Sequence, residues 1–161
     1  MKKALIAYFS ASYGVTKALA GELAAAVGGD LYEIEPVVRY TPADLSWVDK
    51  TSRSTKEMHD LSFRPPIATK VENMDQYDVV FVGFPIWWHI APTIIDTFLE
   101  SYDFAGKTIV PFATSGGDGV GKTDEVLHAL LPNTVNWKPC RLLNGRPSQA
   151  RLTEWVKSLN L

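Results

Sequence analysis

Short apolar runs alternate along the chain with segments of helical periodicity. The most apolar run, residues 77–84, contains four consecutive apolar residues from Val79 to Val82. A run of this kind is typical of a strand that is covered on both faces, as in a parallel sheet. Five strands are predicted, at residues 4–9, 31–35, 77–84, 107–114 and, less apolar than the rest, 137–143. Their alternation with helices predicts right-handed crossovers and a doubly wound α/β fold.

The helical segments repeat apolar residues at intervals of three or four. In residues 15–27, apolar residues recur at every fourth position from Leu19 to Val27, and two glycines then end the pattern. In residues 92–102, a proline opens the segment and the apolar residues form a single stripe. Two more helices are predicted, at residues 123–131 and 149–159.

Residues 36–76, which join the second and third predicted strands, depart from this regular pattern. Beyond a helical turn at residues 42–48, capped by Thr41, the segment shows little apolar periodicity. It is far longer than a crossover needs, and long ordered loops are commonly functional. Its side chains include Trp47, Arg53, His59 and Phe63. The segment therefore either forms a lid over a site or only covers the sheet.

Composition narrows the class of protein. The chain has 161 residues, 46% hydrophobic and 21% charged, which predicts one globular domain spanning residues 1–161. Its 16 basic and 18 acidic residues leave a net charge of −2, so neither nucleic acid nor a membrane surface is an expected partner. Cys140 is the single cysteine, which excludes an intrachain disulfide.

No segment suggests export or membrane insertion. The six mostly apolar residues 4–9 are too few for a signal-sequence core of about 7–15 residues. No stretch approaches the ~18 to 20 uninterrupted apolar residues of a membrane span. The expected location is the cytoplasm.

The first candidate loop lies between the first predicted strand and its helix and reads Ser10-Ala11-Ser12-Tyr13-Gly14-Val15-Thr16-Lys17. Ligands in open parallel sheets bind beyond the carboxyl ends of the strands, where the strand order reverses. Hydroxyl groups and the unpaired amides of a helix start, which carries about +0.5 charge, favour a phosphate. The alternative is that Ser12 or Thr16 only caps the helix.

The second loop, residues 85–89, contains two adjacent tryptophans, Trp87 and Trp88. They cannot both point into the core from one short loop, so at least one faces a ligand or solvent. A planar aromatic ligand would gain apolar burial and ring stacking there. The alternative is that both rings serve core packing or a partner contact.

The third loop, residues 114–121, has four glycines in the six positions from Gly116 to Gly121. Glycines allow a ligand to approach the backbone closely, although a flexible turn would use the same residues. Together, the three loops describe a ligand with a phosphate at one end and a large planar ring at the other.

On these three loops, the sequence resembles the flavodoxin-like FMN-binding family, which includes bacterial flavodoxins and flavodoxin-like NAD(P)H-dependent oxidoreductases. The resemblance covers essentially the whole chain. It implies a five-stranded parallel sheet of order 2-1-3-4-5 with helices on both faces and FMN as the cofactor. It also implies phosphate binding by Ser10, Ser12 and Thr16, with residues 85–88 and 114–117 flanking the isoalloxazine. The candidate cofactor-binding residues are Ser10, Ser12, Tyr13, Gly14, Val15, Thr16, Pro85, Ile86, Trp87, Trp88, Thr114, Ser115, Gly116 and Gly117.

Two features depart from this family. Tyr13 is one residue more than the usual phosphate loop contains, which affects which amides reach the phosphate. The near-neutral charge differs from that of the strongly acidic electron-carrying flavodoxins and favours a reductase supplied by NAD(P)H.

The expected function is that of an FMN-binding redox protein, either an electron carrier or an NAD(P)H-dependent oxidoreductase. The donor is NAD(P)H or a redox protein, and the acceptor is a protein or a small molecule such as a quinone. The protein is expected to be a monomer or homodimer. No protein side chain is needed as a nucleophile, because the flavin carries the chemistry. No metal is expected, since His59, His89 and His128 lack ligand spacing with a carboxylate.

One alternative starts from the third loop. Residues 116–123 match Gly-x-x-x-x-Gly-Lys-Thr, the phosphate-binding signature of P-loop NTPases. Such an enzyme also needs an acidic residue at a neighbouring strand end. The predicted strands that end at Phe84 and Leu143 supply none.

Overall fold

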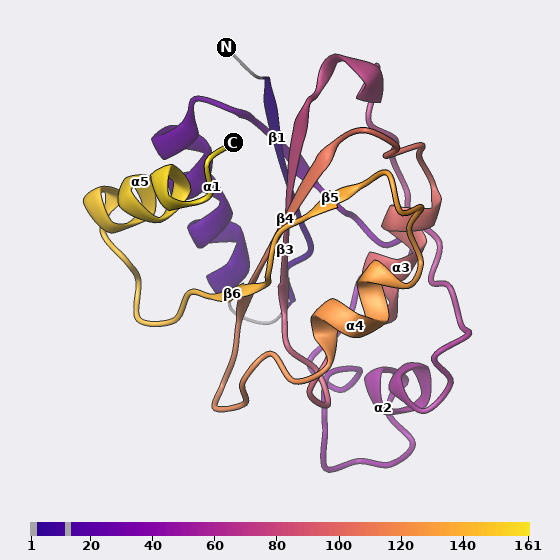
Figure 1. Ribbon diagram of the computed structural model, residues 1–161. Helices are drawn as coiled ribbons and strands as arrows, with labels where there is room; N and C mark the ends of the chain where they lie inside the picture. The colour runs from indigo at the N-terminus through magenta and orange to yellow at the C-terminus, as the bar shows by residue number, and fades with distance from the viewer. Residues whose placement is uncertain (1–2, 12–13) are drawn as a thin grey trace.

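The computed structural model describes residues 3–11 and 14–161 and has the predicted doubly wound α/β fold. The strands pair in parallel in the order β2-β1-β3-β4-β5, and β6 also pairs with β4 (Figure 1). The strands are β1 (Ala4–Tyr8), β2 (Asp30–Glu33), β3 (Val79–Pro85), β4 (Thr108–Thr114), β5 (Asn136–Trp137) and β6 (Arg141–Leu142). The strand order implied by the resemblance is confirmed.

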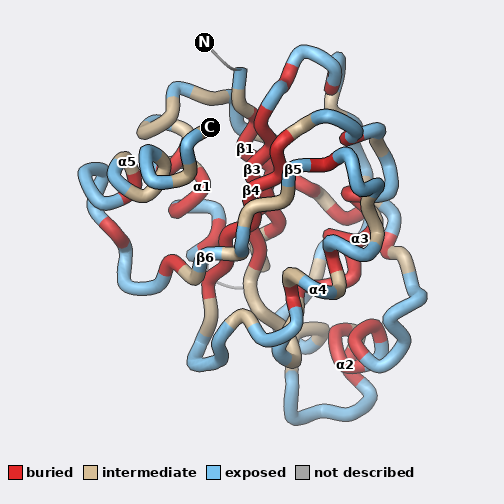
Figure 2. The backbone as a smooth tube through the Cα atoms, in the orientation of Figure 1, coloured by how far each residue is buried: buried red, intermediate tan, exposed pale blue. Residues whose placement is uncertain are grey.

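The central strands β1, β3 and β4 lie almost wholly inside the protein (Figure 2). In β3, every residue from Val79 to Phe84 is buried, in agreement with the strongly apolar sequence of this run. Gly83 leaves room for a neighbouring ring, because a Cβ at this position would stand 2.2 Å from the Phe112 ring of β4. These strands fix the positions from which the three candidate loops begin.

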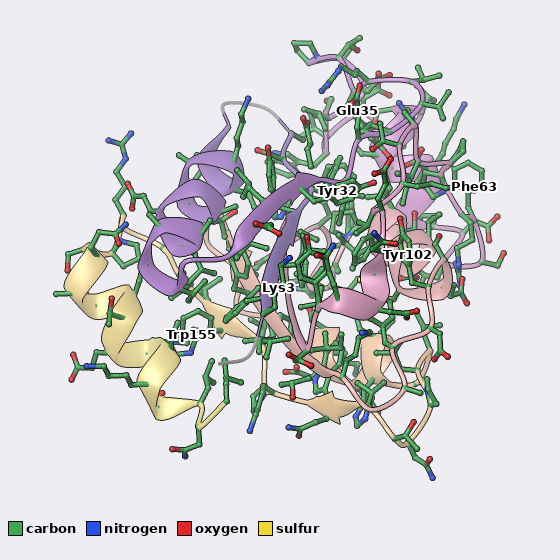
Figure 3. The ribbon with its side chains drawn as sticks, turned by 90° about the horizontal axis from the view of Figure 1, so that it is seen from above. Lys3, Tyr32, Glu35, Phe63, Tyr102 and Trp155 are labelled. Atoms are coloured by element: carbon green, nitrogen blue, oxygen red, sulfur yellow. The ribbon has the colours of Figure 1, made fainter. Side chains whose placement is uncertain are left out.

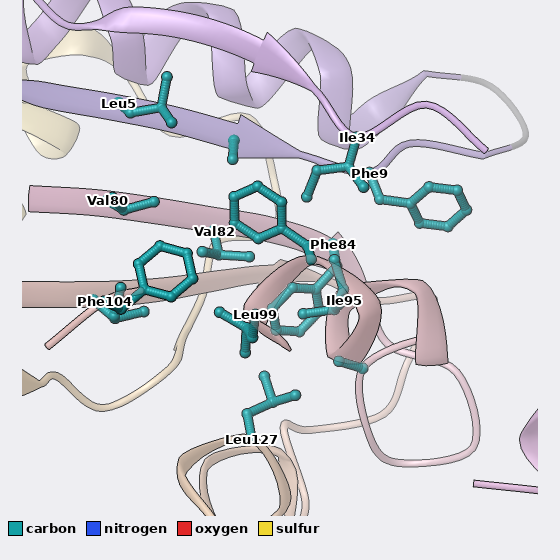
Figure 4. Close-up of a cluster of buried hydrophobic side chains, with 14 of the residues drawn as sticks. Leu5, Phe9, Ile34, Val80, Val82, Phe84, Ile95, Leu99, Phe104 and Leu127 are labelled. Atoms are coloured by element: carbon teal, nitrogen blue, oxygen red, sulfur yellow. The ribbon is translucent and has the colours of Figure 1, made fainter. Parts of the chain in front are cut away.

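Helices cover both faces of the sheet (Figure 1). On one face, α1 (Val15–Val27) and α5 (Gln149–Ser158) enclose a core that contains Phe81. On the other, α3 (Thr93–Glu100) and α4 (Thr123–His128) enclose a larger core that contains Val80 and Val82 (Figure 4). Seen from above, Trp155 of α5 and Tyr102, which follows α3, lie on opposite sides of the sheet (Figure 3).

The predicted fifth strand, residues 137–143, is wrong as a continuous element. The structure divides it into β5 and β6, which both pair with β4. Two features explain the break. Pro139 has no amide hydrogen for a sheet ladder, and the Asp124 carboxylate accepts the Cys140 amide at 2.8 Å. The same carboxylate oxygen accepts the Trp137 indole N–H, also at 2.8 Å.

The first residue of each predicted helix agrees with the structure to within one position, and some last residues differ more. Helix α1 occupies the predicted residues 15–27. Helix α4 ends at His128 rather than at residue 131. The amides of Leu130 and Leu131 donate to carbonyls three residues earlier, as in a 3-10 helix, and Pro132 follows. None of the helices in the described part of the chain is long and apolar enough to cross a membrane.

The segment 36–76 holds two short helices that the apolar pattern does not predict, α2 (Arg53–Met58) and η1 (Met74–Gln76). The Ser52 hydroxyl caps α2 by accepting the Thr55 amide. Buried residues of α2 are Ser54, Thr55, Glu57 and Met58, so most of its buried face is polar. Apolar periodicity therefore could not reveal this helix. The predicted turn capped by Thr41 is present, since the Thr41 hydroxyl accepts the Asp44 amide at 3.2 Å.

Candidate functional site

The three candidate loops meet at the carboxyl edge of the sheet. The loop between β1 and α1 meets the loop after β4, where the hydroxyl groups of Thr16 and Thr114 lie 2.8 Å apart in the interior. The loop after β3 is tied to the same strand, because the Ile86 amide donates to the Thr114 carbonyl at 2.9 Å. Thr114 thus joins the candidate phosphate loop to the tryptophan loop.

In the first loop, the start of α1 remains suited to an anion. Gly14 precedes the helix with a left-handed backbone (φ 74°) and no side-chain cap. Ser10 performs a capping role instead, since its hydroxyl accepts the Lys17 amide at 3.2 Å. Thr16 is buried and its hydroxyl pairs with Thr114. The candidate residues Ser12 and Tyr13 lie outside the described residues.

In the second loop, the chain makes a tight turn from Trp87 to Ile90. The two residues exchange backbone hydrogen bonds of 2.9 and 3.2 Å. The central residues Trp88 and His89 both have positive φ, 49° and 69°. Turns of this kind favour glycine or asparagine, and a larger residue costs about 1–2 kcal/mol at each position. This turn directs the two tryptophans apart.

Both tryptophans line the cleft, and Trp87 also packs against the core. The Trp87 ring contacts Phe9 and Tyr40 edge to face, with centroids 5.6 and 5.4 Å apart, and Phe9 and Tyr40 are themselves 5.5 Å apart. We call these three rings the aromatic triangle. The neighbouring ring of Trp88 is His59, at 6.3 Å. Trp87 is therefore fixed by its packing, and both rings, each half-buried, can contact a ligand in the cleft.

In the third loop, Gly116 and Gly117 leave their surroundings open. A Cβ at either position would meet nothing within 4 Å, so a ligand can approach this backbone. Gly121 has the opposite role, because a Cβ there would stand 2.3 Å from the His89 carbonyl oxygen. The second and third loops are therefore packed together at Gly121 and separate at the cleft.

A cleft of about 560 Å³ lies between these loops and the segment 36–76. Its lining residues are Leu45, Trp47, Ser54, Ile86, Trp87, Trp88, His89, Ser115, Gly116, Gly117 and Asp118. Three of them come from the segment 36–76, including Trp47, which is 76% exposed. At the cleft, His89 Nδ1 lies 3.5 Å from an Asp118 carboxylate oxygen. The segment 36–76 thus forms one wall of the candidate ligand site.

A second cavity of about 490 Å³ adjoins the start of α1. Gly14 and Val15 line it on one side and residues 143–147 on the other. Ser115 lines both cavities, and its amide donates to the Asn144 side-chain oxygen at 2.9 Å. A helix start at one end and tryptophans at the other fit a ligand that carries a phosphate and a planar ring, as FMN does.

The P-loop alternative lacks its chemical requirement. Thr123, whose hydroxyl would have to reach a magnesium ion, is fully buried. Its hydroxyl donates to the Val120 carbonyl at 2.5 Å. Residues 116–123 therefore resemble a P-loop in sequence only. Within residues 3–11 and 14–161, no group of three or more histidine, cysteine or acidic side chains is placed to hold a metal ion.

Comparisons with known proteins agree with this fold. The sequence model of the flavodoxin family matches residues 3–159. A solved structure from Bacteroides eggerthii, classed as a flavoprotein, is 50% identical, covers 100% of this chain and 99% of its own, and has a TM-score of 0.94. One from Bacteroides uniformis, classed likewise, is 48% identical, with 97% and 98% covered and a TM-score of 0.90.

A more distant structure shares the fold. It is a flavoprotein from Lactobacillus acidophilus solved in complex with FMN, 20% identical, with 97% of this chain and 99% of its own covered and a TM-score of 0.72. No curated protein sequence matches the chain significantly. The similar structures include flavoproteins and flavodoxins, and the P-loop alternative finds no support among these.

Proposed function

This chain belongs to the flavodoxin family, and on that premise we propose that it binds one FMN noncovalently and acts as a redox protein. The observation that carries the proposal is the pair of adjoining cavities that share Ser115. One reaches the start of α1, and the other lies between Trp88 and the open backbone of Gly116 and Gly117. When bound, FMN supplies a centre that accepts electrons from a donor and passes them to an acceptor.

The chain's own residues bind and orient the cofactor. At the phosphate end, the amides at the start of α1, beside Gly14 and Val15, offer hydrogen bonds and a partial positive charge. At the ring end, residues 86–89 and 115–118 supply the two sides of the cleft. The Trp88 indole excludes water from its side and offers an aromatic face or edge to a planar ring.

We propose NAD(P)H or a redox protein as the donor and a protein or a small molecule such as a quinone as the acceptor. A net charge of −2 supports an NAD(P)H-supplied reductase over a carrier that docks on basic partners. The exposed Trp47 ring supports a planar small acceptor. The proposed setting is the cytoplasm, without nucleic-acid or membrane partners, and the protein works as a monomer or homodimer.

The experiment combines reconstitution with a turnover assay. The purified chain is saturated with FMN, freed of excess cofactor and mixed with NADH or NADPH and a soluble quinone, with free FMN at equal concentration as the control. The proposal predicts one retained FMN per chain and quinone-dependent nicotinamide oxidation above the control. If the protein retains FMN but oxidises neither NADH nor NADPH, the proposed reductase activity is wrong and the role of an electron carrier is supported. Failure to retain FMN would contradict both.

A further inference from the structure

Tyr40 lies between the cleft wall and a charged pair of α2. On one side, its ring contacts Trp87 edge to face, with an interplanar angle of 71°. On the other side, the Arg53 guanidinium carbon lies 3.8 Å from the ring centroid, a cation–π contact. The Tyr40 hydroxyl donates a hydrogen bond to the Glu57 carboxylate. The ring is therefore held on two sides by different forces.

The charged pair is well satisfied despite its burial. Arg53 Nε donates to a Glu57 carboxylate oxygen at 2.9 Å, and its Nη1 donates to the Val38 carbonyl at 2.6 Å. The side chains of Arg53 and Glu57 are only 22% and 7% exposed. Burial, followed by the hydrogen bond to Glu57, raises the pKa of the Tyr40 phenol, which keeps it protonated as a donor. Removal of one partner would leave the other charge buried without compensation.

The aromatic triangle connects this charged pair to the candidate loops. Phe9 immediately precedes Ser10, the first residue of the candidate phosphate loop, and Trp87 belongs to the tryptophan loop. Tyr40 contacts both rings and comes from the segment 36–76. A shift of Tyr40 would therefore move the wall of the cleft as well as its own segment.

From these contacts, we propose that Tyr40, clamped by Arg53 and Glu57, is a positioning residue that sets the place of Trp87 at the ring end of the cleft. The segment 36–76 thereby controls the affinity and the midpoint potential of the planar cofactor. The effect on the cofactor rests on the proposed function, because it requires that the chain binds FMN. The placement of Trp87 by Tyr40 does not depend on FMN. Apolar contacts alone would allow the Tyr40 ring to shift slightly. The hydrogen bond from Tyr40 to Glu57 and the buried pair of Arg53 and Glu57 restrict such shifts.

The test compares Glu57→Gln, Tyr40→Leu and Tyr40→Phe with a matched control. Glu57→Gln leaves the Arg53 charge without its counter-charge, Tyr40→Leu removes the ring, and Tyr40→Phe keeps the ring but removes the hydroxyl. The control is Glu100→Gln, which breaks an ion pair between the same segment and α3, from Arg64 Nε to Glu100 at 2.5 Å. Arg64 and Glu100 are absent from the aromatic triangle and from the cleft lining.

The first measurement is the indole N–H resonance of Trp87 in the cofactor-free protein, assigned with Trp87→Phe. We expect a clear shift in Glu57→Gln and Tyr40→Leu, a smaller one in Tyr40→Phe and none in Glu100→Gln. The second measurement is FMN affinity and midpoint potential. We expect affinity to fall about tenfold in Tyr40→Leu and the potential to change, with the control within about twofold of wild type.

Two outcomes are decisive. If the Trp87 resonance and the FMN affinity of Glu57→Gln and Tyr40→Leu do not differ from those of Glu100→Gln, the positioning role is wrong. Should Tyr40→Leu fail to fold, Tyr40→Phe and Glu57→Gln carry the same comparison. If wild type fails to bind FMN, the proposed function is wrong, and the indole resonance still decides whether Tyr40 and Glu57 position Trp87.

Discussion

The hydroxyl groups of Thr16 and Thr114 lie 2.8 Å apart in the interior, although 98 positions separate them in the chain. This contact fastens the first turn of α1 to the end of β4. Thr16→Val keeps the shape of the side chain but leaves the Thr114 hydroxyl without this partner, which should cost about 1–3 kcal/mol of unfolding free energy.

Urea unfolding of the two single variants and the double variant tests this contact. Because Thr16→Val and Thr114→Val together remove both polar groups, the double variant should lose less stability than the sum of the singles. Strict additivity would mean that the two hydroxyl groups do not interact.

His89 should be a position where glycine is preferred. Its φ is 69°, a left-handed conformation that costs a side chain about 1–2 kcal/mol. His89→Gly and His89→Ala both remove the imidazole and its contact with Asp118, so their difference isolates the backbone. We expect His89→Gly to unfold at a higher temperature and to be about 1 kcal/mol more stable than His89→Ala. An alanine variant of equal or greater stability would contradict the strained turn.

Asp96 predicts a pH dependence of stability. Burial raises the pKa of this carboxyl group from 3.8 to about 7, and Arg64, 3.7 Å away, opposes the rise. An acid whose pKa is higher in the folded state binds its proton more tightly there, so its contribution to stability is lost as pH rises from about 4 to about 7.

The comparison for Asp96 is with Asp96→Asn, which cannot ionise. The unfolding free energy of the variant minus that of wild type should rise by a few kcal/mol from pH ~4 to ~7 and stay constant above. A difference that does not change with pH would show that Asp96 ionises normally in the folded protein. Chemical unfolding at several pH values supplies the measurement.

Trp87 and Trp88 should respond differently to truncation. Trp88→Ala should weaken FMN binding by about 1–3 kcal/mol and raise the midpoint potential, because an aromatic wall disfavours added negative charge on the ring. Its effect on the unfolding free energy should be small, since the Trp88 ring contacts His59 rather than the aromatic triangle. Trp87→Ala should also destabilise the fold by ~2 kcal/mol or more, because it opens the aromatic triangle.

Redox titration and urea unfolding of both tryptophan variants decide this prediction. If neither variant changes the midpoint potential or the FMN affinity, the tryptophan loop does not contact the cofactor. An equal loss of stability in both would contradict the separate roles of the two rings.

The strands of the sheet and the positions of the loops were predictable because each depends on the local sequence. The apolar run of β3 needs cover on both faces whatever else the chain does, and the loops follow from the ends of the strands. The break between β5 and β6 was predictable only in part. Pro139 marks it in the sequence, whereas the hydrogen bond from the Cys140 amide to the Asp124 carboxylate of α4 exists only in the folded chain.

The wall formed by the segment 36–76 was predictable only as one of two alternatives. Helix α2 is short and buries Ser54, Thr55 and Glu57, so it has no apolar period to detect. The link from Glu57 through Tyr40 to Trp87 joins residues that are distant in sequence and chemically unlike. No spacing rule predicts such a contact, because it arises only in the folded chain.

The comparison of FMN with riboflavin tests the central claim most directly. The two ligands share the isoalloxazine ring and differ in the phosphate that we assign to the start of α1 beside Gly14 and Val15. Since each hydrogen bond to a charged group contributes about 1.5–3 kcal/mol, flavin fluorescence quenching should show a preference for FMN of at least about tenfold. Equal affinity for the two ligands would contradict the phosphate site and with it the proposed placement of the cofactor.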